Sequence, residues 1–174
     1  MACVLTGSQA LDCRDAIGGI KEIKVKKHPG LTTTEADFTV SSGSITAIAT
    51  GSRTLWYTYG VEKETASLAS NTNPNTQQGT NFYTQEIKII LNKLSTRLNE
   101  EMRLLAVMPL LFAVRDFNDN YWIVGKDFGA DLTTGTSGTG AARGDRSGYD
   151  LTFTAKEPLT IQNITKTIYD TLVS

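Results

Sequence analysis

The sequence is poor in the residues that build catalytic and metal-binding sites. Its 174 residues include only two cysteines, Cys3 and Cys13, and one histidine, His28. The cysteines lie close enough in sequence to form a disulfide, but two free thiols are favoured in a reducing compartment. A zinc site is less favoured still, since no third or fourth ligand follows His28 at a usual spacing. We therefore expect a solvated loop histidine beside Pro29, and no metal or cofactor.

An excess of charge and long apolar runs are also lacking. Seventeen basic residues against eighteen acidic ones give a formal charge of −1, so any contact with nucleic acid is expected to be weak or transient. The longest apolar stretch, residues 104–114, contains Pro109 and lies between Arg103 and Arg115. This stretch is too short to span a membrane. The N-terminus turns polar at Thr6, unlike a signal peptide, which predicts synthesis and retention in a cytosol.

Motifs that carry chemistry are present only in incomplete form. Residues 138–143 begin like a dinucleotide-binding loop, but Arg143 stands where the third glycine belongs. Residues 116–121 begin like a calcium loop, but Tyr121 occupies the position of the obligatory glycine, and a β-hairpin turn explains them better. For the tripeptide at 143–145, Arg-Gly-Asp, a structural turn is favoured over a recognition motif. We expect a protein that is not an enzyme.

Short β-favouring segments cover much of the chain. Residues 20–27 alternate apolar and charged side chains, which predicts a half-buried strand whose lysines suit the edge of a sheet. Further segments rich in β-branched and aromatic residues predict an antiparallel sheet. They lie at 36–40, 44–50, 54–59, 61–68, 82–94, 110–117, 121–124 and 149–156.

The strand-helix-strand segment at 82–124 is the best-defined part of the sequence. Ser95 or Thr96 offers an N-cap, apolar residues follow at helical spacing, and Pro109 ends the helix. This predicts one central helix over about 96–107, followed by a hairpin.

Three segments carry few apolar residues. Residues 69–81 contain no charge and no large apolar side chain, which indicates a polar loop, and the Gly-, Thr- and Ser-rich residues 133–148 indicate a long flexible loop. Residues 1–19 are expected to form an N-terminal arm. Residues 20–158 would then form one β-sandwich domain, and 159–174 a C-terminal extension containing a short helix. The expected fold is mainly β, an antiparallel β-sandwich or half-barrel flanked by an α-helix.

The order of these elements resembles that of the tail tube (major tail) proteins of tailed bacteriophages. Residues 1–23, 61–67 and 144–158 are similar to virion structural proteins of phages that infect Bacteroidetes. The resemblance implies a ring of six copies whose inner strands line a channel for DNA, with stacked rings forming a tube. It also implies assembly in the host bacterial cytoplasm and a final location in the virion tail.

The partners implied are further copies of the chain, other tail or neck proteins, and DNA in transient, non-specific contact with a polar or acidic lumen. Edge strands would pair between protomers, while the N-terminal arm and long loops would clasp the next ring. We expect the assembly surfaces at 1–19, 64–81 and 133–148. The candidate interface residues are Cys3, Leu5, Leu11, Glu62, Glu64, Leu68, Asn73, Pro74, Gln77, Thr136, Arg143 and Arg146.

Two other functions remain open from the sequence. A neck, tail-terminator or connector protein would form one ring without stacking. A monomeric β-domain that binds carbohydrate or protein belongs to a different class.

Overall fold

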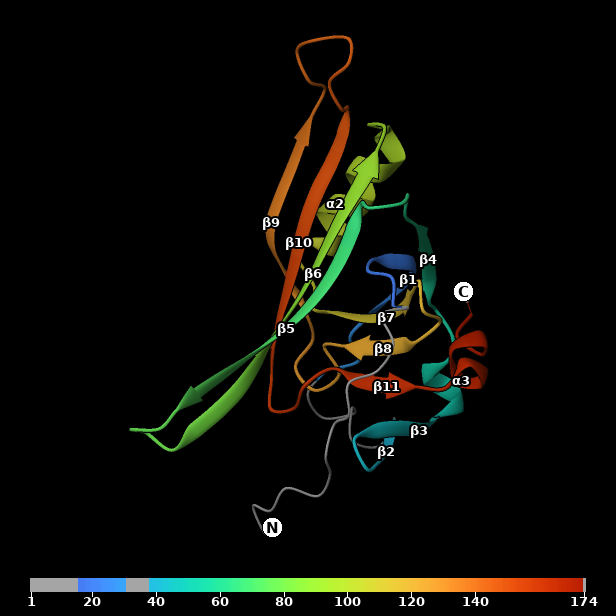
Figure 1. The fold of residues 1–174 in the computed structure, drawn as a ribbon. Coiled ribbons are helices and arrows are strands. Elements are labelled where there is room, and N and C mark those ends of the chain that lie inside the picture. Colours follow the sequence, from blue (N-terminus) through green and yellow to red (C-terminus); the bar gives the residue numbers. More distant parts are fainter. Residues whose placement is uncertain (1–15, 31–37, 174) are drawn as a thin grey trace.

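The computed structural model describes residues 16–30 and 38–173, and it is built mainly from two β-sheets (Figure 1). The predicted mainly-β fold is confirmed. Cys3, Leu5, Leu11 and Cys13 lie outside the described residues.

The larger sheet, which we call the body sheet, has seven strands. Its neighbouring strands are antiparallel except for β11 and β3, which pair in parallel. Their order across the sheet is β2 (Phe38–Ser41), β3 (Ser44–Ile48), β11 (Gln162–Ile164), β8 (Tyr121–Val124), β7 (Leu110–Asp116), β1 (Ile20–Lys27) and β4 (Tyr57–Gly60). A short 3-10 helix, η1 (Thr50–Ser52), precedes β4.

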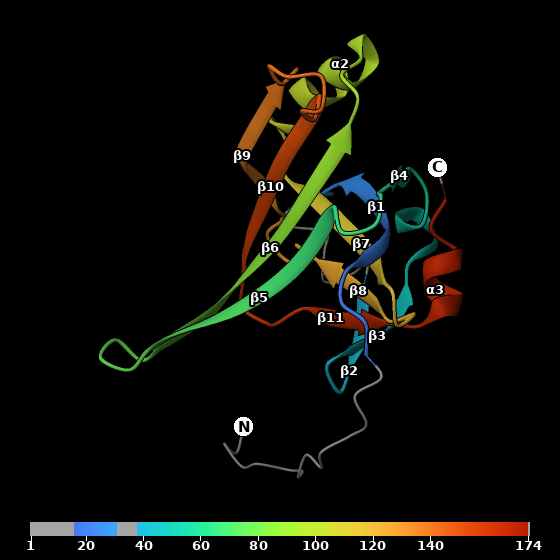
Figure 2. The same ribbon diagram turned by 45° about the horizontal axis from the view of Figure 1, so that its top comes forward.

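The smaller sheet, which we call the arm sheet, has four antiparallel strands that run across those of the body sheet (Figure 2). Their order is β5 (Ala66–Asn75), β6 (Thr80–Asn92), β10 (Gly148–Glu157) and β9 (Asp131–Gly138). The strands β6 and β10 pair over their whole shared length, from Gly148 opposite Asn92 to Glu157 opposite Tyr83.

Two hydrophobic clusters lie on opposite faces of the body sheet. The inter-sheet cluster packs the body sheet against the arm sheet, and the second cluster lies beneath helix α3 (Lys166–Asp170). Strand β7 supplies both, since Phe112 and Val114 belong to the first and Leu111 and Ala113 to the second. The alternation of side chains along a strand explains how one apolar run serves two cores.

Strand β1 forms as predicted, but the expectation that it lies at an edge is wrong. It pairs with β7 on one side and with β4 on the other. One of its lysines bonds within the fold, since Lys24 Nζ donates hydrogen bonds to the carbonyl oxygens of Tyr169 and Leu172 at 3.1 and 2.9 Å. The outer strands of this sheet, within the described residues, are β2 and β4.

Both segments expected as loops contain strands, so these two predictions are wrong in part. Residues 69–81 form the outer half of the β5–β6 hairpin, with only 76–79 as its turn. Residues 131–138 form β9, and the loop is confined to 139–147. Conversely, residues 61–65, expected as strand, form a turn before β5. Backbone pairing with a neighbouring strand imposes these strands, without the alternation of apolar side chains that marks a half-buried strand.

The predicted helix is present as α2 (Thr96–Leu105), and the Oγ atom of Ser95 caps it by accepting a hydrogen bond from Leu98 N at 3.2 Å. A short helix is also present near the C-terminus, as predicted, but α3 covers only Lys166–Asp170, and Gln162–Ile164 form strand β11. The segment expected as a C-terminal extension lies within the fold, because β11 is inserted between β3 and β8. Within the described residues, no helix has the length and apolar character needed to cross a membrane.

Candidate assembly surfaces

The hairpin arm, by which we mean residues 69–83, extends away from the rest of the molecule in both views (Figures 1 and 2). None of its residues belongs to either hydrophobic cluster, and no charged side chain occurs between Glu64 and Glu86. The predicted interface residues Asn73, Pro74 and Gln77 lie on it and are largely exposed or half-buried.

Side-chain amides hold the arm in shape. Asn73 Nδ2 donates to Thr84 Oγ1 at 2.8 Å across the two strands. At the tip, Asn75 Oδ1 accepts hydrogen bonds from the backbone nitrogens of Gln77 and Gln78 at 3.2 and 3.1 Å. The turn closes with Gly79 at φ +64°, a conformation that glycine adopts without strain.

The base of the arm is anchored to the body. Gln85 is buried, and its amide donates to Leu159 O at 3.0 Å and accepts from Gly125 N at 3.1 Å. Leu68, a predicted interface residue, is half-buried and packs against the inter-sheet cluster. The arm therefore emerges from a fixed base.

The β9–β10 tip carries the predicted residues Thr136, Arg143 and Arg146. Thr136 is exposed on β9, and Arg143 is exposed in the loop that follows. Arg146 points back toward β10, with Nη2 lying 3.6 Å from the carboxylate of Asp150. Asp145 Oδ2 accepts hydrogen bonds from the backbone nitrogens of Ala141 and Ala142, and these bonds lower the pKa of its carboxyl. The tripeptide at 143–145 thus includes a turn-forming aspartate, which confirms the structural reading of that motif.

Glu62 and Glu64, also predicted at the interface, lie in the turn that precedes β5. Glu62 Oε2 accepts a hydrogen bond from Asn92 Nδ2 at 2.7 Å, at the end of β6, and Glu64 is exposed with φ +63°. These residues lie far from the tip of the arm, because that tip is at the start of β6.

Apart from Leu68 at the base of the arm, the predicted residues within the described chain therefore lie at two opposite ends of the arm sheet. Because Gly148 is opposite Asn92, the β9–β10 tip lies at the end of β6, together with Glu62. Asn73, Pro74 and Gln77 lie at its start. Sequence reasoning named both groups but contained no signal for their separation.

Along β6 and β10, the outer face of the arm sheet is polar and balanced in charge. Its charged residues on these two strands are Glu86, Lys88, Asp150 and Lys156. Lys88 and Asp150 form an ion pair at 3.6 Å. The two positive and two negative charges of these four residues cancel. On β10, Thr152 and Thr154 lie between Asp150 and Lys156.

The β7–β8 turn confirms the predicted hairpin in place of a calcium loop. Both oxygens of Asp116 are occupied, since Oδ1 accepts from the backbone nitrogens of Asn118 and Asn120 at 2.8 Å, and Oδ2 accepts from Asn120 Nδ2 at 3.1 Å and Trp122 Nε1 at 3.3 Å. Across residues 16–30 and 38–173, no three His, Cys, Asp or Glu side chains gather closely enough to hold a metal ion.

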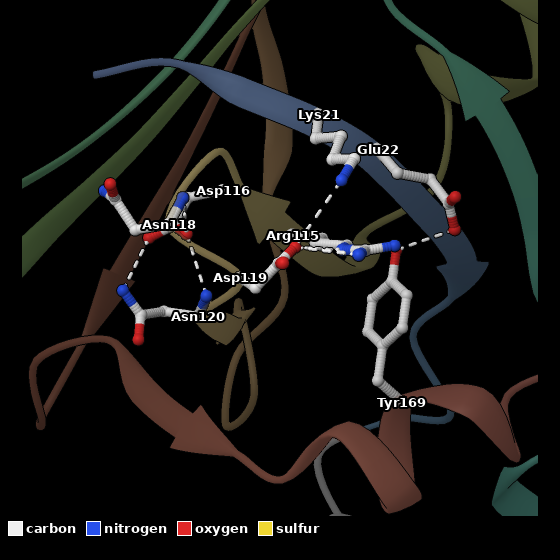
Figure 3. A network of polar contacts seen from close by, with 8 residues as sticks. All are labelled: Lys21, Glu22, Arg115, Asp116, Asn118, Asp119, Asn120 and Tyr169. Atoms are coloured by element: carbon white, nitrogen blue, oxygen red, sulfur yellow. Dashed lines mark hydrogen bonds and ion pairs between the residues drawn. The ribbon is translucent and has the colours of Figure 1, made fainter. Parts of the chain in front are cut away.

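The same turn holds the start of the described chain and strand β1, and Figure 3 shows the contacts of Asp119 with Arg115 and Lys21. Ile17 exchanges two hydrogen bonds of 2.8 Å with the side-chain amide of Asn118. Asp119 contacts Arg115 at 2.7 Å and Lys21 at 3.6 Å, and the hydrogen bond from Arg115 lowers the pKa of Asp119. The point where the N-terminal segment joins β1 is thereby held to the body.

Several polar residues are buried that the sequence predictions did not place in the interior, among them His28 and Glu157. His28, expected as a solvated loop residue, is 3% exposed, so that expectation is wrong. Its Nδ1 accepts from Gly30 N at 3.2 Å, which leaves Nε2 to donate to Lys126 O at 3.1 Å. Glu157 accepts from the backbone nitrogens of Asp127 and Phe128 at 3.0 Å.

Glu157 ties the arm sheet to the body. Burial raises its pKa to about 7, although the two backbone hydrogen bonds favour the ionised form. The alternation of β10 offered a signal, because Phe153 and Ala155 point into the core and residue 157 continues the same face.

One open groove of about 660 Å³ lies between β4, the end of β6 and α2. Tyr57 and Tyr59 line one wall, and Arg97 and Glu101 of α2 line the other. Sequence reasoning assigned no role to this place, since its walls come from three separate segments.

Comparisons of the chain with protein-family models, curated proteins and solved structures found no match.

Proposed function

We propose that the protein is a virion structural protein, the tail tube subunit of a tailed bacteriophage, and that six copies form rings that stack into a channel for DNA. The hairpin arm is the observation that carries this proposal. A two-stranded ribbon is marginal in water by itself, yet this one extends beyond both hydrophobic clusters. An exposed, uncharged ribbon of this kind suits docking on a neighbouring copy.

The free edges of the arm sheet support closure of a ring. Within the described residues β5 and β9 each have one strand neighbour, so each leaves a row of backbone groups available for pairing. Pairing of β5 in one copy with β9 in the next is a heterologous contact, which can close after a fixed number of copies.

The two ends of the arm sheet support stacking. Asn73 and Gln77 lie at one end, and Arg143 lies in the loop at the other. Contacts between unlike ends repeat along an axis, as stacking of rings requires.

The outer face of the arm sheet supports a role as the lumen wall. Lys88 and Lys156 would hold phosphate if they were alone, but Glu86 and Asp150 offset them. DNA would then slide past without persistent ionic contacts.

Negative-stain electron microscopy of the purified full chain tests the proposal. We expect rings and tubes. Single rings that never stack would favour a neck, tail-terminator or connector protein instead. A light-scattering mass of one chain would contradict assembly and favour a monomeric β-domain that binds carbohydrate or protein.

Charge variants test whether the arm makes the contact. Asn73→Lys combined with Gln77→Lys places two positive charges on the arm, and we expect loss of polymers. Thr39→Lys combined with Thr46→Lys places the same charges at exposed positions of β2 and β3 in the body sheet. This control should still polymerise, and equal loss in both variants would count against the arm.

A further inference from the structure

The groove between β4 and α2 has an unpaired strand edge as one wall. Strand β4 pairs with β1 from Tyr57 opposite Val25 to Gly60 opposite Glu22. Within the described residues no strand pairs on its other side, and all four of its residues line the groove. Every second residue of β4 therefore directs its N–H and C=O toward the groove.

The facing wall contains a second, shorter edge. Strand β6 continues past its partner β5, whose last pair in this direction is Ala66 opposite Ile89. On the β10 side of β6, Lys93 N donates a hydrogen bond to Ser147 O. On the opposite side, Ile90 N donates a hydrogen bond to Thr65 O. By alternation the backbone of Asn92 faces away from β10, toward the groove that it lines.

The groove has an apolar floor and a charged rim. Tyr59, Leu91 and Leu98 line it and pack against the inter-sheet cluster. At the rim, Glu62 and Glu101 outnumber Arg97.

Tyr59 is a neutral part of this floor. Burial, followed by the charge of Glu101, raises its pKa to about 12, so its hydroxyl stays protonated in the groove that Glu101 also lines. Apolar side chains suit the floor, and cationic side chains suit the rim.

We infer that this groove binds an extended peptide segment of a partner protein, which adds to β4 as a further strand. Apolar side chains at alternate positions enter the groove, and lysine or arginine side chains lie against Glu62 and Glu101. Main-chain pairing with β4 provides the affinity, while the groove selects the side chains. The inference goes beyond the proposed function and does not depend on ring formation.

A fluorescent, end-blocked peptide of alternating lysine and valine is the probe, and anisotropy with the full-length protein is the measurement. We expect saturable binding, and binding about tenfold weaker for the matching peptide of glutamate and valine, because the rim carries excess negative charge. No saturable binding of the lysine peptide, or equal binding of the two peptides, would overturn the inference.

N-methylated forms of the same peptide test strand pairing. Methylation of every valine amide in one form, or every lysine amide in the other, removes donors along one edge of the added strand. Because only one edge meets β4, one form should lose binding and the other should keep most of it. Equal binding of both forms would show that no strand is added. Saturation by maltoheptaose in place of the peptide would also overturn the inference, since a sugar has no peptide backbone to pair.

Two variants on the same helical turn locate the site. Glu101→Gln keeps the size of the side chain and removes the rim charge, and we expect binding of the lysine peptide to weaken about two- to fivefold. Glu100→Gln is the matched control, because Glu100 pairs with Arg103 at 3.3 Å and does not line the groove. An equal effect of both variants would contradict the assignment to the groove.

Discussion

The body sheet and the hairpin arm are both built from paired strands, but different parts of the chain stabilise them. Strand β7 in the body sheet is buried on both faces, and Phe112 and Val114 are completely inaccessible to solvent. No residue of the arm belongs to either hydrophobic cluster, and the arm relies on backbone pairing and amide hydrogen bonds such as Asn73 to Thr84. Burial of apolar side chains therefore stabilises the body more than it stabilises the arm.

Two phenylalanines give the largest contrast. Phe112 is 0% exposed, and the centroid of its ring lies 4.9 Å from that of Phe153, whereas Phe82 in the arm is 40% exposed. We expect Phe112→Ala to lower the free energy of unfolding by about 3–5 kcal/mol through the lost burial and the cavity. Phe82→Ala should change it by less than about 0.5 kcal/mol. Urea unfolding measures both, and similar losses would break the comparison.

Two glycines with positive φ give the next contrast. A Cβ atom at Gly125 would lie 2.8 Å from Ala130 N and 2.9 Å from Leu110 O, whereas one at Gly79 would meet nothing within 4 Å. Gly79→Ala should cost about 1 kcal/mol, the strain of a left-handed backbone. Gly125→Ala should cost about 2–4 kcal/mol, because a backbone clash adds to that strain. Equal shifts in the thermal midpoints of the two variants would show that the backbone around Gly125 moves to accommodate the added Cβ atom.

The junction between the two regions should respond to pH through Glu157. Folding raises its pKa from an ordinary value of 4.5 to about 7, so its contribution is fully present below the ordinary value and is lost as the pH rises through about 7. We expect the free energy of unfolding to fall by about 1–3 kcal/mol between about pH 5 and about pH 8.

Urea unfolding of Glu157→Gln at both pH values isolates this group, since the variant should lose that part of the pH dependence. Asp150→Asn, on the outward face of the same strand, is the control and should keep it. If the free energy of unfolding of Glu157→Gln falls with pH as much as that of the wild type, another residue causes the pH dependence.

Helix caps give the smallest effect. Ser95→Ala removes the acceptor for Leu98 N at the start of α2 and should cost about 1 kcal/mol. Thr165→Ala removes the acceptor for Ile168 N at the start of α3. That hydrogen bond is longer, at 3.4 Å, so its loss should cost less. Thermal unfolding of both variants measures the difference, and a larger loss for Thr165→Ala would show that the length of the cap hydrogen bond does not set its strength.

The elements that bury apolar side chains are predictable from the sequence, and those held by the backbone are not. Periodicity and a serine cap predict α2, and alternation predicts β10. The arm has the composition of a loop because its residues are polar and include Pro74, which is acceptable there only because β5 is an edge strand.

Contacts between residues far apart in sequence account for the remaining differences between the predictions and the structure. Nothing local indicates that Lys24 bonds to the carbonyl oxygens of Tyr169 and Leu172, or that His28 reaches Lys126 O. The candidate assembly segments at 64–81 and 133–148 come from the sequence and stay predictions. Their position at opposite ends of one sheet depends on the register of β6 against β10.

Truncation of the hairpin arm tests most directly whether assembly depends on the arm while folding does not. Replacing residues 72–83 with Asn-Gly joins Asn71 to Thr84, which are opposite each other in the hairpin, by a turn that favours it. Gln85 and its hydrogen bonds to Leu159 and Gly125 stay in place. We expect a thermal midpoint within about 5 °C of the parent, together with the loss of rings and tubes by electron microscopy. Polymers that persist in the truncated protein, or a chain that no longer folds, would contradict the account.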